Sequence, residues 1–322
     1  MPLFLSLAPI RGFTNALYRN LYSRHFKGID AAIAPFITTL CAKQINRAHI
    51  KDILPENNNG MPVVPQIIGN DPAAFIQLAT TFHNLGYPTV NWNLGCPFPM
   101  VAKKRRGSGM LPHPRMIAAF LDAVIPRIPT RMSIKARIGR EKKEEIFHLL
   151  PIFNQYPLEE IILHPRTGVQ MYTGAVDLDT FEQCLALLNL PVTYNGDIFD
   201  YASFISLRDR FRTVSRWLIG RGVLANPFLP GILRSGEETI FEPVKRFKKF
   251  HDELFEGYRA ELSGPSHLVD KMKGYWLYFF RSFETGEAFF KKMKKVTAVK
   301  KYEELVSRFF EEEAVWRPEI RF

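Results

Sequence analysis

Cysteine is scarce in this sequence. Three cysteines, Cys41, Cys96 and Cys184, are spread over 322 residues, and no two of them have the spacing of a metal-binding pair. Their odd number and wide separation argue against a disulfide framework, which favours a reducing compartment. We therefore expect no bound metal and a cytoplasmic location.

Long hydrophobic runs are also missing. No apolar stretch approaches the ~18 residues that a membrane-spanning helix needs. No cationic segment precedes the first apolar run, so we expect neither a signal peptide nor a membrane partner. The residues after the first predicted strand, 8–13, also lack the Gly-x-Gly-x-x-Gly spacing of an open dinucleotide-binding sheet.

Positive charge is present in excess. The formal net charge is +11 and the isoelectric point is about 9.5. This balance favours a polyanionic partner, nucleic acid before membrane. Hydrophobic residues make up 46% of the chain, which is enough for a large core.

Short apolar segments alternate with amphipathic ones up to about residue 225, which is typical of a parallel sheet with helices between its strands. Eight such units point to a closed (β/α)₈ TIM barrel, with an open doubly wound sheet as the alternative. The predicted strands are 4–8, 31–35, 63–68, 89–94, 132–138, 160–164, 192–195 and 216–219. The predicted helices are 15–25, 71–85, 114–125, 141–156, 178–188 and 201–211.

The pattern changes after about residue 237, where helical segments rich in aromatic residues and lysine replace the strands. The predicted helices are 244–262, 267–283 and 288–310. We therefore expect a catalytic barrel over residues 1–236 and a small all-helical domain over 237–322. The helical domain's lysines are expected either to bind nucleic-acid phosphates or to form only a solvated face.

The stretch from Asn91 to Leu111 reads NWNLGCPFPMVAKKRRGSGML. Gly95 and Pro97 predict that a strand ends there and turns, which places Cys96 at the tip of the turn. Four consecutive cations, residues 103–106, follow the thiol and are suited to an anionic substrate. The alternative interpretation is a buried, inert cysteine beside a solvated loop.

Polar residues and glycines recur where the predicted strands end. The active site of a TIM barrel lies at this edge, so a shared ligand explains the pattern better than separate buried polar groups. The residues concerned are Pro9 and Ile10; Gln66; Asn91 and Asn93; Lys135 and Arg137; His164 and Arg166; Asn195, Gly196 and Asp197; and Gly220, Arg221 and Gly222.

Glycines after the seventh and eighth strands predict a phosphate site, because their main-chain N–H groups can approach an anion closely. Arg221 adds positive charge there. Lys135, His164, Gln66 and Asn93 are suitable donors to a ring with several carbonyls and nitrogens. Flavin mononucleotide (FMN) fits this combination, since a lysine or histidine near the ring stabilises the reduced anion.

Taken together, these motifs resemble the tRNA-dihydrouridine synthases, flavin enzymes that reduce a uridine in RNA. The resemblance runs from Ala8 to about Pro227. It rests on ordered blocks: residues 8–12 (APIRG), 65–69 (PQIIG), 93–97 (NLGCP), 107–109 (GSG), 134–139 (IKARIG), 164–167 (HPRT) with Gln170 and Tyr172, 195–198 (NGDI) and 220–222 (GRG).

The resemblance implies a role for matching residues. Cys96 would protonate uracil C5, while FMN reduced by NADPH would deliver hydride to C6. Asn93, Lys104, Arg137 and Arg166 would contact the substrate. The residues implied in flavin binding are Pro9, Ile10, Gln66, Lys135, His164, Asn195, Gly196, Asp197, Gly220 and Arg221.

The resemblance implies tRNA as partner, with rRNA still possible, and we expect a monomer. Two other functions remain open at this stage. The chain could be a flavin barrel that reduces a small molecule, although the basic loop and the helical segment argue against that. It could also be an RNA-binding protein without catalysis, although Cys96, Lys135 and His164 argue against that.

Overall fold

The structure is a computed structural model, and it describes residues 2–317. Contacts divide the chain into two compact units. The barrel unit comprises the residues up to Ala16, Asp30–Gly196 and Phe211–Leu218; the helical unit comprises Leu17–Ile29, Asp197–Arg210 and the residues from Ile219 onward. The helical unit therefore takes in two segments that precede residue 219, Leu17–Ile29 and Asp197–Arg210, and the sequence-based boundary at residue 236 stays a prediction.

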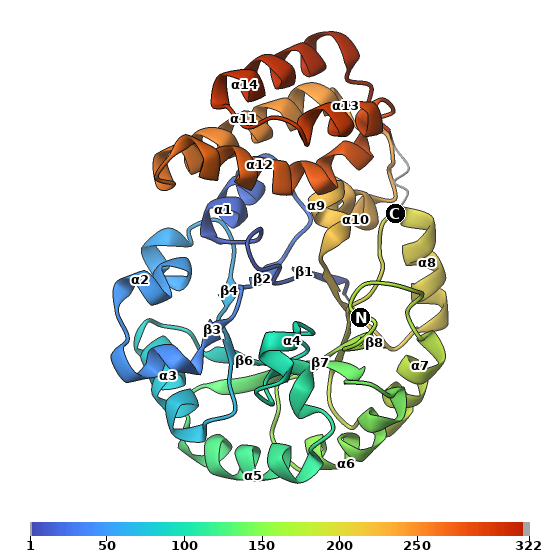
Figure 1. Cartoon of the computed structure of the whole chain (residues 1–322). Helices are drawn as coiled ribbons and strands as arrows, with labels where there is room; N and C mark the ends of the chain where they lie inside the picture. The colour runs from blue at the N-terminus through green and yellow to red at the C-terminus, as the bar shows by residue number, and fades with distance from the viewer. Residues whose placement is uncertain (1, 318–322) are drawn as a thin grey trace. The chain divides into compact units, whose positions relative to one another are not determined.

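A parallel sheet forms the centre of the barrel unit (Figure 1). Its strand order is β3-β5-β6-β7-β8-β9-β10-β1-β2-β4. The strands are β1 (Phe4–Leu7), β2 (Ala31–Ile33), β3 (Ile37–Thr38), β4 (Val63–Val64), β5 (Gln66–Ile68), β6 (Thr89–Leu94), β7 (Arg131–Gly139), β8 (Ile161–Thr167), β9 (Val192–Tyr194) and β10 (Arg216–Ile219).

The strand order closes into a ring because two strands of the barrel are each interrupted and counted as two segments. β2 and β3 are parts of one strand broken around Pro35, and β4 and β5 are parts of another broken at Pro65, where no N–H can join a ladder. β2 pairs with β4 while β3 pairs with β5, so the segments form a closed ring of eight strands in chain order. The predicted (β/α)₈ barrel is confirmed.

Helices of the barrel unit surround the strands (Figure 1). The predicted start of the helix at residue 71 is confirmed, because the Asp71 carboxylate accepts the Ala74 N–H at 3.2 Å and Pro72 occupies the first turn. The helices are α2 (Arg47–Ile50), α3 (Pro72–Asn84), α4 (Pro99–Ala102), α5 (Pro114–Val124), α6 (Leu150–Phe153) and α7 (Leu178–Leu187).

Trp92 determines which side chains of β6 face the barrel interior. Its ring stacks on Phe120 of α5 at 4.0 Å between centroids and meets the edge of Phe75 of α3 at 6.3 Å. Successive side chains of a strand point to opposite faces, so Asn91 and Asn93 face inward. Aromatic packing outside the barrel thus directs polar amides into it.

The predicted helix over residues 141–156 is wrong. The structure has a 3₁₀ segment, Lys143–His148, followed by the short helix α6. Pro151 explains the break, because it has no N–H to continue a helix from the preceding turn.

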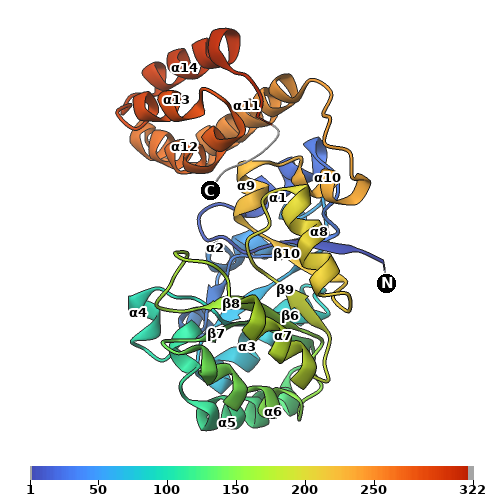
Figure 2. The same ribbon diagram turned by 90° about the vertical axis from the view of Figure 1, so that its right-hand side faces the viewer.

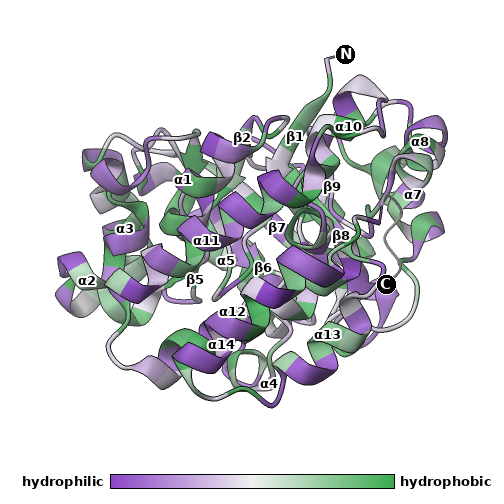
Figure 3. Ribbon diagram, turned by 90° about the horizontal axis from the view of Figure 1, so that it is seen from above, coloured by the Kyte–Doolittle hydropathy of each residue, from purple (hydrophilic) through white to green (hydrophobic). Residues whose placement is uncertain are grey.

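The helical unit contains α1 (Ala16–His25, except its first residue), α8 (Tyr201–Arg210), α9 (Arg221–Ala225), α10 (Leu229–Ser235), α11 (Pro243–Glu261), α12 (Pro265–Phe279), α13 (Gly286–Met293) and α14 (Val299–Arg308). Hydrophobic and hydrophilic residues alternate along α11 and α12 (Figure 3). The first two predicted C-terminal helices are confirmed in position. The third, 288–310, is wrong as one helix, since the β-branched pair Val296–Thr297 lies in a break between α13 and α14.

Aromatic side chains form the core of the helical unit. Tyr18 of α1 stacks on Tyr275 of α12 at 5.8 Å and meets the edge of Phe250 of α11 at 5.7 Å. Trp276 packs on Phe289 at 4.5 Å. The helix that follows β1 is therefore part of this core, which explains why contacts assign it to the helical unit. None of the described helices is long and apolar enough to cross a membrane.

A buried hydrogen-bond chain crosses this core. The Trp276 indole N–H donates to the Tyr302 hydroxyl at 2.9 Å, and that hydroxyl lies 2.7 Å from His251 Nε2. The Asp252 carboxylate only accepts, so the His251 proton lies on Nδ1, 3.0 Å from Asp252 Oδ1. The neutral ring then accepts the Tyr302 hydroxyl hydrogen at Nε2. Burial lowers the pKa of His251, although Asp252 opposes part of that shift.

This chain predicts that stability falls on mild acidification. The lowered pKa means that the unfolded chain binds a proton below about pH 6.5 while the folded state resists it. The contribution of His251 to the free energy of unfolding should therefore be constant above about pH 7 and decrease as the pH falls from 6.5 to 5. In His251→Gln this decrease should shrink when urea unfolding is measured at each pH.

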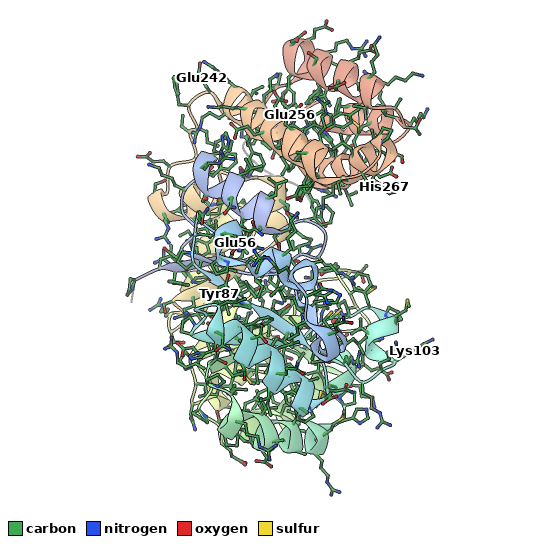
Figure 4. The ribbon with its side chains drawn as sticks, turned by 90° about the vertical axis from the view of Figure 1, so that its left-hand side faces the viewer. Glu56, Tyr87, Lys103, Glu242, Glu256 and His267 are labelled. Carbon is green, nitrogen blue, oxygen red and sulfur yellow. The ribbon has the colours of Figure 1, made fainter. Side chains whose placement is uncertain are left out.

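The control is His267→Gln, an exposed histidine that points outward from the start of α12 (Figure 4). It should keep the wild-type profile. Equal profiles for wild type and His251→Gln would contradict the assignment of a neutral histidine.

Candidate active site

Cys96 lies in the turn that follows β6, and the Asn93 side chain holds that turn. Asn93 Oδ1 accepts the N–H of Gly95 at 3.0 Å and that of Cys96 at 2.9 Å. The Cys96 side chain is buried, with the residue 6% exposed. The turn predicted from Gly95 and Pro97 therefore exists, and Asn93 fixes it.

The 3₁₀ segment Gly107–Met110 and the residue after β7 hold the turn from the other side. The Cys96 carbonyl accepts both the N–H of Ser108 at 3.0 Å and its hydroxyl at 2.9 Å. Arg140 donates to the Pro97 carbonyl at 2.9 Å and to the Ser108 hydroxyl at 3.3 Å. Gly107, with φ +55°, passes so close that a Cβ on it would lie 2.8 Å from the Cys96 Cβ. The turn is clamped along both edges.

A chain of amides connects this turn to neighbouring strands. The register of the sheet places Gln66 beside Asn91 and Asn93 beside Lys135. Asn93 donates to Gln66 Oε1 at 2.7 Å, Gln66 donates to Asn91 Oδ1 at 2.7 Å, and Asn91 donates to the Ser133 hydroxyl at 2.8 Å. These side chains satisfy one another's hydrogen-bonding groups inside the barrel.

Lys135 of β7 lies among like charges. Burial and, to a lesser extent, the neighbouring Arg137 lower its pKa to about 7, whereas Cys96 opposes the shift. A lysine with this pKa changes charge near neutral pH, so an anionic group placed beside it would restore its proton. Such a perturbed group at a strand end marks a candidate functional site.

Burial raises the pKa of the Cys96 thiol above its ordinary value. The Phe98 N–H, which bonds to the sulfur, opposes that rise, as do the charges of Arg11, Arg137 and Lys135. The thiol is therefore protonated at neutral pH. The thiolate that it leaves after giving up its proton lies near three cations, which favour proton release at the moment of transfer.

Arg137 is buried, and its guanidinium is held by main-chain oxygens. Its Nε donates to the Gly95 carbonyl at 3.1 Å, and one terminal nitrogen donates to the Thr167 carbonyl at 2.7 Å. The guanidinium also lies over the Tyr172 ring at 5.4 Å. The structure thus places Arg137 where it supports the Cys96 turn, while substrate contact by Arg137 stays a prediction.

His164 and Arg166 face the interior from β8. Arg166 approaches His164 Nε2 at 3.3 Å and donates to the Gly174 carbonyl at 2.6 Å through the other terminal nitrogen. The His164 ring lies 6.3 Å from the Tyr172 ring. Burial lowers the pKa of Arg137 to about 10, and Arg166 contributes to that shift, so several cations gather at this end of the barrel.

The basic run, residues 103–106, contains three exposed side chains and one that is held by a hydrogen bond. Lys103, Lys104 and Arg105 are exposed, and Figure 4 shows Lys103 pointing away from the barrel. Arg106 is half-buried, and its Nε donates to Asn70 Oδ1 at 3.2 Å. Asn70 also donates to the Lys104 carbonyl at 3.1 Å, so the residue after β5 anchors the run.

The predicted phosphate residues fall into two groups. Asn195 and Gly196 belong to the barrel unit, where Asn195 donates to the Leu218 carbonyl at 2.7 Å. A Cβ on Gly196 would lie 2.2 Å from the Tyr194 hydroxyl, so only glycine fits beside that side chain.

The remaining phosphate residues belong to the helical unit. Gly220 caps α9, and Arg221 donates to Asp197 Oδ1 at 2.6 Å, a pairing that sequence reasoning did not foresee. Asp197 thus neutralises part of the charge that Arg221 was expected to offer. A Cβ on Gly222 would lie 2.1 Å from the Ile198 carbonyl oxygen.

Pro9 and Ile10 lie half-buried directly after β1. Thr14 holds this segment, because its hydroxyl donates to the Ala8 carbonyl at 3.0 Å and accepts the Ile10 N–H at 2.8 Å. Sequence reasoning missed the residues that hold the site in place, namely Asn70, Ser108, Arg140 and the supporting role of Asn91. The alternation around Trp92 was the signal for Asn91.

Comparison with known proteins shows the family of this chain. The family model for dihydrouridine synthase (Dus) matches residues 6–314. The chain belongs to the dihydrouridine synthase family. The match spans both the barrel strands and most of the helical segment, so family membership does not rest on the barrel alone.

Curated relatives and solved structures were also compared. A tRNA-dihydrouridine(16) synthase of Aquipseudomonas alcaligenes is 23% identical over 94% of this chain and 98% of its own length. A tRNA-dihydrouridine synthase B of Pseudomonas aeruginosa is 27% identical over 76% of this chain and 74% of its own length. Morphinone reductase has a TM-score of 0.52 at 14% identity, covering 74% of this chain and 87% of its own, which shows the barrel fold alone.

The close approach at Gly107 predicts an effect of one methyl group. Gly107→Ala should displace the Cys96 turn, because the added Cβ would lie 2.8 Å from the Cys96 Cβ and carbonyl oxygen. We expect the rate at which iodoacetamide alkylates Cys96 to change several-fold, with a changed pH midpoint. Mass spectrometry of the Cys96 peptide measures it.

The control is Gly86→Ala, which carries the same left-handed strain, with φ +93° and nothing within 4 Å of the new Cβ. Both variants should lose about 1 kcal/mol of stability through the backbone, but Gly86→Ala should leave the alkylation of Cys96 unchanged. Identical alkylation in all three proteins would show that Gly107 does not position the thiol.

Proposed function

We propose that this chain reduces a specific uridine of tRNA to 5,6-dihydrouridine, with FMN as bound cofactor and NADPH as electron donor. The observation that carries the proposal is a protonated thiol, fixed at the open end of a barrel and surrounded by cations. Family membership and the names of the relatives support the substrate class. The alternative substrate is rRNA. Mapping dihydrouridine in cellular RNA, with and without this protein, decides between tRNA and rRNA.

The residues present fit a flavin. Lys135 has a pKa near neutrality and lies beside Asn93, whose amide is joined to Gln66. A lysine of this kind suits the anionic edge of a reduced flavin ring. Gly196 and Asn195 are suited to the phosphate end in the barrel unit. When bound, the flavin supplies the hydride that adds to uracil C6.

Cys96 supplies the proton that completes the reduction. The raised pKa keeps the proton on Sγ until C5 of the uracil needs it, and the thiolate that results is then reprotonated from solvent. Asn93 and Gly107 hold the sulfur in place during this transfer. Arg166 lies further along the inner face of β8, where it is suited to hold a uracil oxygen, while His164 on the same face is suited to hold the flavin.

Access to the uracil requires that it leave the base stack. An enzyme that acts on one base of a folded RNA has to extract it into a concave pocket. The exposed cations Lys103, Lys104 and Arg105 lie on the segment that follows the thiol, where they can bind the phosphates around an extracted nucleotide. A flavin enzyme for a small molecule has no use for such a run, which makes that alternative less suitable.

Replacement of Cys96 tests the reaction. Cys96→Ala should slow the oxidation of pre-reduced enzyme by substrate tRNA by roughly 10²–10⁴-fold, the usual contribution of a general acid. The flavin content and the rate of reduction by NADPH should stay as in wild type, because neither step uses the thiol. Stopped-flow absorbance of the flavin measures both half-reactions.

The matched control is Cys184→Ala on α7, where burial raises the thiol pKa to about 12 and no predicted site residue lies nearby in sequence. It should oxidise at the wild-type rate. If Cys96→Ala also keeps that rate, another group gives the proton and the proposed mechanism is wrong.

The exposed cations give a second test through salt dependence. Lys103→Ala combined with Lys104→Ala should reduce the slope of log affinity for tRNA against log salt by roughly 0.7–0.9 for each phosphate that the protein no longer neutralises. A double variant of two other exposed cations, Arg127→Ala with Arg131→Ala at the opposite end of β7, serves as the control. An equal slope change in both double variants would indicate net charge rather than a local interaction.

A further inference from the structure

Two large apolar side chains are exposed directly beside the catalytic turn. Met100 is 82% exposed, the largest value for any large hydrophobic side chain among the described residues, and Phe98 is 50% exposed. Met100 lies on α4 and Phe98 immediately precedes that helix, so the pair stands four and two positions after Cys96. Exposed apolar groups cost hydration free energy, so a pair of them at an active site suggests a partner.

The backbone that carries this pair is firmly held. The Phe98 carbonyl accepts the N–H of Val101 at 2.9 Å and that of Ala102 at 3.0 Å, which closes the single turn of α4. Ala102 is buried against Gly109, where a Cβ would lie 2.2 Å from the Ala102 carbonyl oxygen. Met100 and Phe98 therefore project from a fixed backbone, so binding has only their side chains left to order.

The pair is physically linked to the thiol. The Phe98 N–H bonds to the Cys96 sulfur, so the Phe98 backbone and the proton donor belong to one turn. Figures 1 and 2 together show α4 standing in front of one end of the barrel. A base that reaches the thiol leaves its neighbours close to α4.

The positive charges next to Phe98 and Met100 indicate which kind of partner binds this surface. Lys103, Lys104 and Arg105 follow Met100 within five residues, and all three are exposed. An apolar pair between a buried thiol and a row of cations fits a polyanion that also offers flat apolar faces. Unstacked RNA bases on a phosphate backbone have this chemistry, because each base presents a π-face and each linkage a charge.

We propose that Phe98 and Met100 fill the gap in the stack that the extracted uridine leaves and support the adjoining bases. Proteins that unstack nucleic acid bases often insert phenylalanine or methionine between base steps. The proposal rests on the proposed function, since it assumes that the uridine is drawn out of a stack. It assigns these two side chains to base extraction, and proton transfer stays with Cys96.

The first experiment compares a folded with an unfolded substrate. The variants are Phe98→Ala, Met100→Ala and the double variant, with Leu187→Ala as control, because Leu187 is 53% exposed at the end of α7 in the same unit. The substrates are the tRNA and a short unstructured oligoribonucleotide with the same uridine. We expect the double variant to lose roughly tenfold or more in kcat/KM on the tRNA and little on the oligonucleotide, while Leu187→Ala loses nothing on either.

The outcomes separate this proposal from the proposed function. An equal loss on both substrates would mean that the pair acts on the thiol and not on the stack, and no loss on either would mean that the surface is unused; both results overturn the proposal. Two results together support both proposals: Cys96→Ala loses activity on both substrates, and the double variant loses activity on the tRNA but little on the oligonucleotide.

A binding measurement gives an answer even without turnover. 2-Aminopurine placed next to the mapped uridine in the tRNA brightens when its stacking is disturbed. Wild-type enzyme should raise this fluorescence, and so should Leu187→Ala and Cys96→Ala, whereas the Phe98 and Met100 double variant should bind with a smaller rise. The same rise in wild type and double variant overturns the proposal.

Discussion

The hydrogen bonds from the Gly95 and Cys96 N–H groups to Asn93 Oδ1 fix the site. They end β6 in a turn that would otherwise leave two buried donors without a partner. The amide of Asn93 is itself held by Gln66 on the adjacent strand β5, so the position of the thiol depends on the barrel wall beside it. The Cys96 thiol is therefore positioned by the sheet itself.

The charges around the turn are costly to the free protein and useful to its chemistry. Burial and the charge of Arg137 lower the pKa of Lys135, and burial and the charge of Arg166 lower the pKa of Arg137. Like charges are gathered at such cost where an anionic ligand is to be bound. Phosphates and the anionic edge of a reduced flavin are ligands of this kind, and the same cations favour the thiolate that Cys96 leaves behind.

The sequence alone predicted the barrel. The alternation of apolar and amphipathic segments and the polar residues at the ends of the predicted strands repeat from one β/α unit to the next. It also predicted that Cys96 lies on a turn, since Gly95 and Pro97 are local signals. Local sequence signals did not predict the side-chain contacts between residues that are far apart in the sequence. The pairing of Arg221 with Asp197 and the anchoring of the basic run by Asn70 join residues that are 24 and 34 to 36 positions apart. The break before Pro151 was readable, but helical periodicity on both sides concealed it.

The exposure of Met100 has a consequence for the working life of the protein. A thioether as exposed to solvent as that of Met100 is readily oxidised to the sulfoxide. The sulfoxide is polar and is no longer suited to lie against a base. The buried thiol four residues earlier is shielded from the same oxidant. If Met100 has the proposed role, preparations that have aged in air would keep an intact Cys96 thiol yet handle folded RNA poorly, and methionine sulfoxide reductase would restore them.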